Sequence, residues 1–232
     1  MIRFSLFGIP VSIHPTLWLT LALLGGAVGI SSMAEFLSVA LFIIAAFICL
    51  LVHEFGHAIV GRRLGGGHPH VYLAWMGGDC SNTEARLTRI QGVIMTAAGP
   101  LATVLLAVVA TLVLGLYLQD VPKAFSLASR FMVGQMPVEA LSLCPPMAMF
   151  FFFYLVEVAC WWTILNLLPV FPLDGGQIMH GLMKSPRLMH SISFCAACLF
   201  TAFFCVAGMW LMAVFMVMLA FLNQRFYSQA PY

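Results

Sequence analysis

The amino-acid sequence predicts an all-α membrane protein: a polytopic helical bundle of about six transmembrane helices with a short membrane-associated β-hairpin or strand. Two observations predict this class. Of the 232 residues, 62% are hydrophobic and only 8% are charged, whereas roughly a quarter of the residues in a typical soluble domain are charged. The apolar residues also form blocks long enough to cross a bilayer, for which a helix needs about 20 residues.

Six apolar segments are expected to span the membrane within one domain, 1–232. They cover about 16–30, 36–60, 90–118, 147–169, 188–205 and 207–222. The last two belong to one block, 188–222, which as a straight helix would be about 50 Å long, against a hydrocarbon core of about 30 Å. A turn near Gly208 is therefore expected to divide this block. A single span here, giving five in all, is the alternative.

The stretches between the spans are more polar. Residues 65–89 cannot span a membrane, because they include charged side chains, histidines and several glycines. Within them, residues 71–76 lie between Pro69 and Gly77, a pattern typical of a short strand or hairpin arm. Residues 119–146 contain four prolines and are expected to form an interfacial loop, which can include an amphipathic turn. His190, close to a basic turn, is also expected at the interface.

Composition excludes several other classes of protein. The net charge is +2, and no basic run or aromatic-plus-basic motif supports a nucleic-acid partner. Seven cysteines are an odd number, and most lie in apolar stretches, so buried free thiols are expected rather than a disulfide framework.

The basic residues predict the orientation of a multi-pass protein in the cell membrane. With a cytoplasmic N-terminus, most of them lie on the cytoplasmic side, where lysine and arginine are enriched. These are Arg3, Arg62, Arg63, Arg86, Arg89, Lys184 and Arg187, whereas Lys123 and Arg130 lie outside.

Ionisable side chains inside a membrane are costly and therefore mark functional sites. His53-Glu54-Phe55-Gly56-His57 places three of them within five residues. Residues i and i+4 share one helix face, so both imidazoles can reach a single Zn²⁺. Glu54 can then lie beside the metal and act as general base on a water molecule. A chance match, with hydrogen-bonded buried histidines, is the alternative, and the membrane location disfavours it.

Helix rise gives the depth of this motif. His53 precedes Arg62 by nine residues, or about 13 Å along the axis. The motif is therefore expected inside the hydrocarbon, nearer the cytoplasmic side.

A catalytic zinc usually has three protein ligands, and Asp174 is the candidate for the third. It follows an apolar segment broken by Pro169 and Pro172 and precedes Gly175. Unwound backbone at membrane depth occurs only where it is enclosed by protein or lines a wet cavity. The alternative is an interfacial aspartate that caps a helix beginning at Gly175.

These motifs resemble those of the site-2 protease family of intramembrane zinc metalloproteases. Residues 53–57 resemble the family's H-E-x-G-H motif, and residues 166–175 its N-x-x-P-x-x-P-L-D-G motif. Residues 8–14 resemble the start of the shorter members. The resemblance extends to about residue 180. Thr103 is a departure, because it stands where the family's G-P-x-x-N motif has asparagine, and this puts the polar contact made there in doubt.

The resemblance implies one Zn²⁺ per chain, held by His53, His57 and Asp174, and hydrolysis of a peptide bond in or near a substrate's transmembrane segment. Glu54 and Asn166 would be catalytic. Asn166 either donates a hydrogen bond to the developing oxyanion or satisfies freed backbone groups. The implied partners are a transmembrane protein substrate, the lipid bilayer and a regulatory membrane partner. The short form, without added soluble domains, fits a bacterial or archaeal cytoplasmic membrane.

The strand at 71–76 is expected to hold an unwound substrate segment by edge pairing. The sequence leaves two non-enzymatic alternatives. A metal transporter would use the same ligands but needs polar groups leading in and out of the site. An inactive scaffold would have no use for Glu54.

Overall fold

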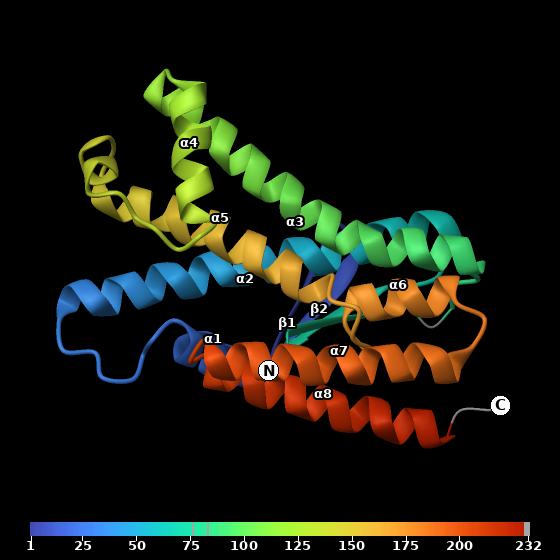
Figure 1. The fold of residues 1–232 in the computed structure, drawn as a ribbon. Coiled ribbons are helices and arrows are strands. Elements are labelled where there is room, and N and C mark those ends of the chain that lie inside the picture. The colour runs from blue at the N-terminus through green and yellow to red at the C-terminus, as the bar shows by residue number, and fades with distance from the viewer. Residues whose placement is uncertain (76, 83, 230–232) are drawn as a thin grey trace. The chain divides into compact units, whose positions relative to one another are not determined.

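The computed structural model describes residues 1–75, 77–82 and 84–229, and most of them are helical. Figure 1 shows the elements in chain order. The elements are β1 (Ile2–Leu6), β2 (Ile9–Ile13), α1 (Pro15–Leu24), α2 (Met33–Gly65), β3 (His70–Ala74), β4 (Gly77–Ser81), α3 (Arg89–Leu118), α4 (Val121–Phe131), the 3-10 helix η1 (Val138–Ser142), α5 (Pro146–Asn166), α6 (Asp174–Leu182), α7 (Pro186–Val206) and α8 (Trp210–Gln229). The chain divides into two compact units, 1–86 with 98–163, and 87–97 with 164–232.

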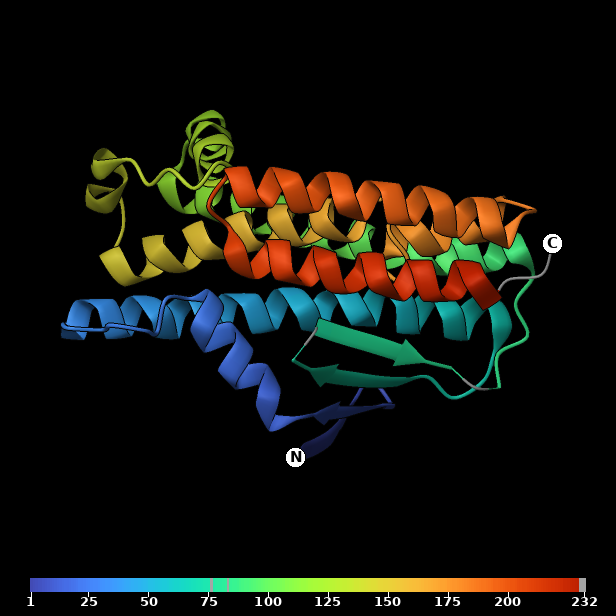
Figure 2. The same ribbon diagram turned by 60° about the horizontal axis from the view of Figure 1, so that its bottom comes forward.

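The first unit contains a four-stranded sheet in the order β1-β2-β3-β4. The β1–β2 and β3–β4 pairs are antiparallel hairpins, whereas β2 and β3 pair in parallel, with Val11 opposite Val71. Both of these valines are fully buried, because the sheet packs one face into the core of the unit. Figure 2 shows the β3–β4 hairpin alongside α2, which it contacts.

The strand predicted at 71–76 is confirmed as β3, with Met76 outside the described residues. β1 and β2 were not predicted, because five-residue strands with Pro10 in one of them give a weak pattern. His14 follows β2 and caps α1, since its Nδ1 accepts a hydrogen bond from the Thr16 N–H at 3.3 Å.

Five helices among the described residues are long and apolar enough to cross a membrane: α2, α3, α5, α7 and α8. The span expected at 16–30 is not among these five helices. α1 has only 10 residues, or about 15 Å, which is half the thickness of the hydrocarbon core. The helix ends at Gly25, and Gly26 and Gly29 have positive φ angles of 81° and 87°. The sequence block is apolar throughout, but its glycines stop the helix early.

Three of the long helices pack together in the first unit. α2, α3 and α5 contribute small or slender buried side chains to one cluster, which allows their backbones to approach closely. Its buried members are Ala45, Cys49, Ala110, Leu155 and Ala159. This packing fixes the middle of α2, directly before the His53 motif.

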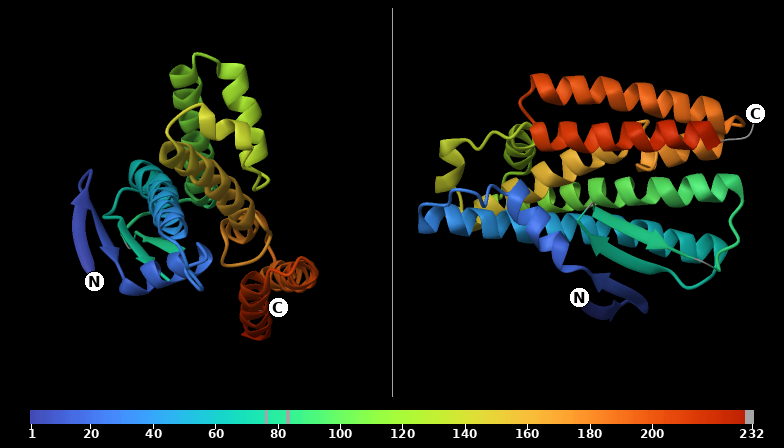
Figure 3. Two further views of the ribbon diagram at one scale, coloured as in Figure 1. Left: turned by 90° about the vertical axis from the view of Figure 1, so that its left-hand side faces the viewer. Right: turned by 90° about the horizontal axis from the view of Figure 1, so that it is seen from below.

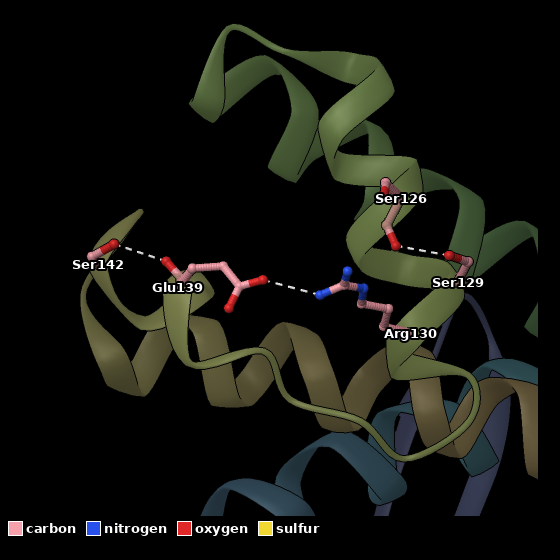
Figure 4. A network of polar contacts seen from close by, with 5 residues as sticks. All are labelled: Ser126, Ser129, Arg130, Glu139 and Ser142. Carbon is pink, nitrogen blue, oxygen red and sulfur yellow. Dashed lines mark hydrogen bonds and ion pairs between the residues drawn. The ribbon is translucent and has the colours of Figure 1, made fainter.

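α4 and η1 lie within the stretch expected as an interfacial loop. α4 buries Ala124, Leu127 and Phe131 on one face. Figure 4 shows that Arg130 donates a hydrogen bond to the Glu139 carboxylate, at 3.0 Å. The backbone N–H of Glu139 and then Arg130 lower the pKa of this exposed carboxyl. The stretch is therefore more ordered than the expected loop.

The second unit is built on α7 and α8, which lie side by side in Figure 3. The two helices are joined at Gly208, whose φ is 73°. The predicted division of the 188–222 block is therefore confirmed. Val170, from the segment before α6, is buried in the core that α7 and α8 share.

Candidate metal centre

The long helix α2 positions the histidine motif. It begins after Ser32, whose hydroxyl accepts a hydrogen bond from the Glu35 N–H, and ends at Gly66, which has a φ of 71°. His53, Glu54 and His57 lie in its second half and are only 2%, 4% and 7% exposed. Three ionisable side chains are thus buried together on one helix within an apolar unit.

The two histidines converge on one point. Their Nε2 atoms are 3.1 Å apart, and their ring planes are inclined at 83°. Two imidazole nitrogens bound tetrahedrally to zinc, at about 2.0–2.1 Å each, would be separated by roughly 3.3 Å. The pair therefore has nearly the spacing that a shared zinc ion requires.

Thr103 on α3 influences which ring nitrogen of His53 carries a proton. The Thr103 hydroxyl donates to the Gly99 carbonyl at 3.1 Å and lies 3.1 Å from His53 Nδ1. A hydroxyl has a single proton, so when Thr103 donates it to Gly99 its oxygen accepts from His53 Nδ1–H. The Nε2 lone pair of His53 is then free of a proton and faces His57. Threonine thus supplies a polar contact at the position where the sequence departs from the family motif.

Two glycines allow α3 to approach the histidines. A Cβ at Gly99 would collide with the imidazole of His57, and a Cβ at Gly56 would collide with the Ala98 carbonyl oxygen. Side chains at these positions would therefore push the helices apart. α3 continues as one helix through Pro100.

Glu54 faces the sheet. A Cβ at Gly78 on β4 would overlap the Glu54 carboxylate, so this carboxylate lies directly against the β4 backbone. Burial, together with the negative charges of Glu54 and Asp79, raises the pKa of the Cys80 thiol to about 12. Trp162 covers the neighbouring Gly77 and contacts His53 edge to face, with ring centroids 6.2 Å apart.

Asp174 lies in the second unit, at the first residue of α6, and is 5% exposed. Leu173, rather than Asp174, occupies the N-cap position, which argues against the capping alternative. Gly175 and Gly176 are needed here, because a Cβ at either would collide with the backbone of residues 167–171. The start of α6 is therefore folded tightly over the segment that precedes it.

The sequence-predicted site residues are all buried. The structure brings His53, Glu54 and His57 together in the first unit, while Asp174 and Asn166, the last residue of α5, belong to the second. By residue type, His53 and His57 of the first unit and Asp174 of the second are suited to binding one metal ion. The oxyanion role of Asn166 stays a prediction.

Sequence reasoning missed several residues that support this site. Gly78 was noted only as the boundary of a strand, and the contact of Thr103 was left in doubt. His190, expected at the interface, is buried and hydrogen-bonded to Asn223. A polar residue in an apolar helix was the available signal for His190 and Asn223.

Comparison with known proteins identifies the family and the fold of this chain. A curated zinc metalloprotease of Methanocaldococcus jannaschii is 26% identical over 200 residues, which cover 82% of this chain and 49% of that protein. The chain thus spans about half the length of this relative. The solved structure of a site-2 protease from the same organism has a TM-score of 0.60 and 20% sequence identity, covering 97% of this chain and 94% of that one, and so shares the fold. The model of peptidase family M50 matches residues 41–223, most of the chain, and the chain therefore belongs to this family.

Proposed function

We propose that this protein is an intramembrane zinc metalloprotease, which hydrolyses a peptide bond in or near the transmembrane segment of a membrane protein. The observation that carries the proposal is the buried histidine pair of α2, whose Nε2 atoms lie 3.1 Å apart, with Glu54 beside it. Membership of a peptidase family supports the same reaction.

His53, His57 and Asp174 are the proposed ligands of one zinc ion. Two neutral imidazoles and a carboxylate are a usual ligand set for catalytic zinc, which keeps a further position open. The buried, hydrogen-bonded state of His53 fits this role, because a proton held on Nδ1 by Thr103 leaves Nε2, the atom that faces His57, unprotonated. When bound, zinc supplies Lewis acidity, which polarises a carbonyl oxygen and lowers the pKa of a water molecule.

Glu54 is the proposed general base and general acid. Its carboxylate takes one proton from the attacking water, and it delivers a proton to the amide nitrogen as the C–N bond breaks. The contact with Gly78 holds the carboxylate in place, since the β4 backbone leaves it no room on that side. Asn166 is the proposed donor to the developing oxyanion.

The free edge of the sheet is the proposed place for an unwound substrate segment. β3 pairs with β2 on one side and with β4 on the other, so neither of its edges is open to a substrate strand. The expectation of edge pairing at 71–76 was therefore wrong. Among the described residues β4 pairs with β3 alone, which leaves its other edge open, and it passes directly over Glu54 at Gly78. A substrate strand added to β4 would bring its backbone close to the general base.

The chain is a multi-pass membrane protein, and the site is proposed to lie nearer the cytoplasmic side. Arg62 and Arg63 are in the last turn of α2, and His53 lies nine residues earlier, about 13 Å along the axis. Lysine and arginine at a helix end favour the cytoplasmic face. A bacterial or archaeal cytoplasmic membrane and a regulatory membrane partner remain part of the proposal.

A cleavage assay tests the proposal. The full chain is purified in detergent with a single-span substrate, and the zinc content is measured on the same preparation. Glu54→Gln should abolish cleavage while retaining zinc, and a chelator should abolish cleavage by the unsubstituted protein. Glu35→Gln, at an exposed position on the same helix, is the matched control and should leave both unchanged. Cleavage that persists in Glu54→Gln, or that survives complete removal of zinc, would overturn the proposal.

A further inference from the structure

The segment 167–173, which leads into Asp174, is not part of a regular helix although it follows the apolar helix α5. Backbone N–H and C=O groups freed at membrane depth need partners supplied by the protein. Some of these partners lie within the segment, such as the Leu173 N–H that donates to the Val170 carbonyl at 2.8 Å. The partners of Phe171 lie elsewhere.

Both backbone polar groups of Phe171 bond to side chains of the last two helices. The Phe171 N–H donates to the Ser193 hydroxyl of α7 at 3.1 Å. The Phe171 carbonyl accepts from the Asn223 amide of α8 at 2.6 Å. Ser193 and Asn223 are completely buried. One residue of the unwound segment is thus held between two helices that are distant in sequence.

The Asn223 amide is itself held in one orientation. Its NH₂ group also donates to the Leu219 carbonyl at 2.9 Å, so both of its protons are used. Its oxygen lies 3.0 Å from His190 Nδ1 and must therefore accept a proton from that ring. His190 on α7 thereby fixes the direction in which Asn223 faces Phe171.

The ring of Phe171 is enclosed as well. It packs edge to face against His190 and Phe226, with centroids 5.6 and 5.7 Å away. Side chain and backbone of Phe171 are therefore restrained by the same pair of helices.

The restraint on Phe171 also affects Asp174, which is close to it in the chain. Phe171 precedes Asp174 by three residues, and a Cβ at Gly176 would collide with the Phe171 N–H. The first turn of α6 thus rests directly on the restrained residue. A shift of Phe171 would move the start of α6, and Asp174 with it.

We infer that Ser193, Asn223 and His190 are positioning residues for Asp174, so that the α7–α8 hairpin holds the loop of the third zinc ligand. The inference rests on the proposed function, because it takes Asp174 to be a ligand. Lipid-facing or packing helices have no need of two buried polar side chains that bond to one residue and a third that orients one of them, since such groups are costly in a membrane.

The test is a double-mutant cycle on zinc affinity, measured by competition with a chromophoric chelator on the full chain in detergent. Ser193→Ala and Asn223→Leu are each combined with Asp174→Ala. Ser191→Ala is the matched control, because its hydroxyl donates to the Arg187 carbonyl of its own helix. Loss of a residue that orients a ligand typically weakens metal affinity about 10- to 100-fold.

We expect Ser193→Ala and Asn223→Leu to weaken zinc binding by about this factor in the native background. In the Asp174→Ala background neither should weaken it further, and Ser191→Ala should have no effect in either. If Asn223→Leu does not fold, Ser193→Ala, which removes one oxygen atom, decides the question alone.

Three results would overturn the inference, and they are distinguishable. Unchanged zinc affinity in Ser193→Ala and Asn223→Leu, with a clear loss in Asp174→Ala, refutes the positioning role alone. Equal losses with and without Asp174 show that the residues do not act through it. Unchanged affinity in Asp174→Ala removes Asp174 from the proposed ligand set, and the inference fails with it.

Discussion

Thr103 accepts a hydrogen bond from Nδ1 of His53 at 3.1 Å while donating its own proton to the Gly99 carbonyl. A side chain on α3 therefore sets which nitrogen of an α2 histidine carries a proton. The hydrogen bond between Thr103 and His53 therefore bears directly on metal binding.

Thr103→Val keeps the shape of the side chain but removes the oxygen that accepts from His53. We expect zinc affinity to fall about 10-fold or more, because His53 loses the bond that favours the tautomer with an unprotonated Nε2. Thr103→Ser keeps the hydroxyl and should retain most of the affinity. Chelator competition gives the affinity, and nitrogen NMR of the labelled imidazoles gives the tautomer. Equal affinities in the Val and Ser variants would show that the hydroxyl has no such role.

Gly99→Ala introduces a methyl group that collides with the His57 imidazole. We expect the variant to lose zinc, because α3 or His57 must move from its position. The matched control is Gly92→Ala on the same helix, where nothing lies within 4 Å of an added Cβ. Metal content after purification is the measurement. Full zinc occupancy in Gly99→Ala would contradict the close packing described above.

Gly78→Ala places a methyl group where the Glu54 carboxylate lies. Because Glu54 is the proposed general base and not a ligand, we expect kcat to fall while zinc content is unchanged. Loss of a well-placed base typically costs about 10²-fold or more. Cleavage rate and metal content are measured on one preparation. A variant with normal kcat would show that Glu54 does not depend on this contact.

Cys80 offers a chemical probe of Glu54. The pKa of its thiol is about 12, raised mainly by burial and further by Glu54 and Asp79. The reactive thiolate is therefore scarce at pH 8, and alkylation should be slow. Glu54→Gln removes one negative charge, which lowers the pKa and should speed alkylation at a given pH. The pH profile of the alkylation rate, followed by mass spectrometry, checks both statements. An unchanged profile in Glu54→Gln would contradict the electrostatic link.

The sequence was sufficient for the residues whose placement follows from local periodicity. His53 and His57 share a helix face because they are four residues apart, and Gly208 marks the turn between α7 and α8. Asp174 could be singled out because prolines and glycines break the apolar segment around it. In each case the signal lies within about ten residues of the feature.

The remaining features depend on contacts between distant parts of the chain. Ser193 and Asn223 bond to Phe171 across 22 and 52 residues, so no local pattern could reveal them. In the sequence Gly78 is typical of a turn, and its contact with Glu54 arises only because the sheet packs on α2. The length of α1 was overestimated because hydropathy counts apolar residues, whereas the helix stops where the glycines adopt positive φ angles.

The parallel pairing of β2 with β3 has a consequence for biogenesis. β2 ends at Ile13 and β3 begins at His70, so α1 and all 33 residues of α2 are synthesised between the two partners. The β1–β2 hairpin is therefore synthesised well before its parallel partner and stays an incomplete half-sheet until β3 follows. The second hairpin can dock only after the whole of the histidine-bearing helix has been synthesised. Completion of the sheet therefore always follows synthesis of α2.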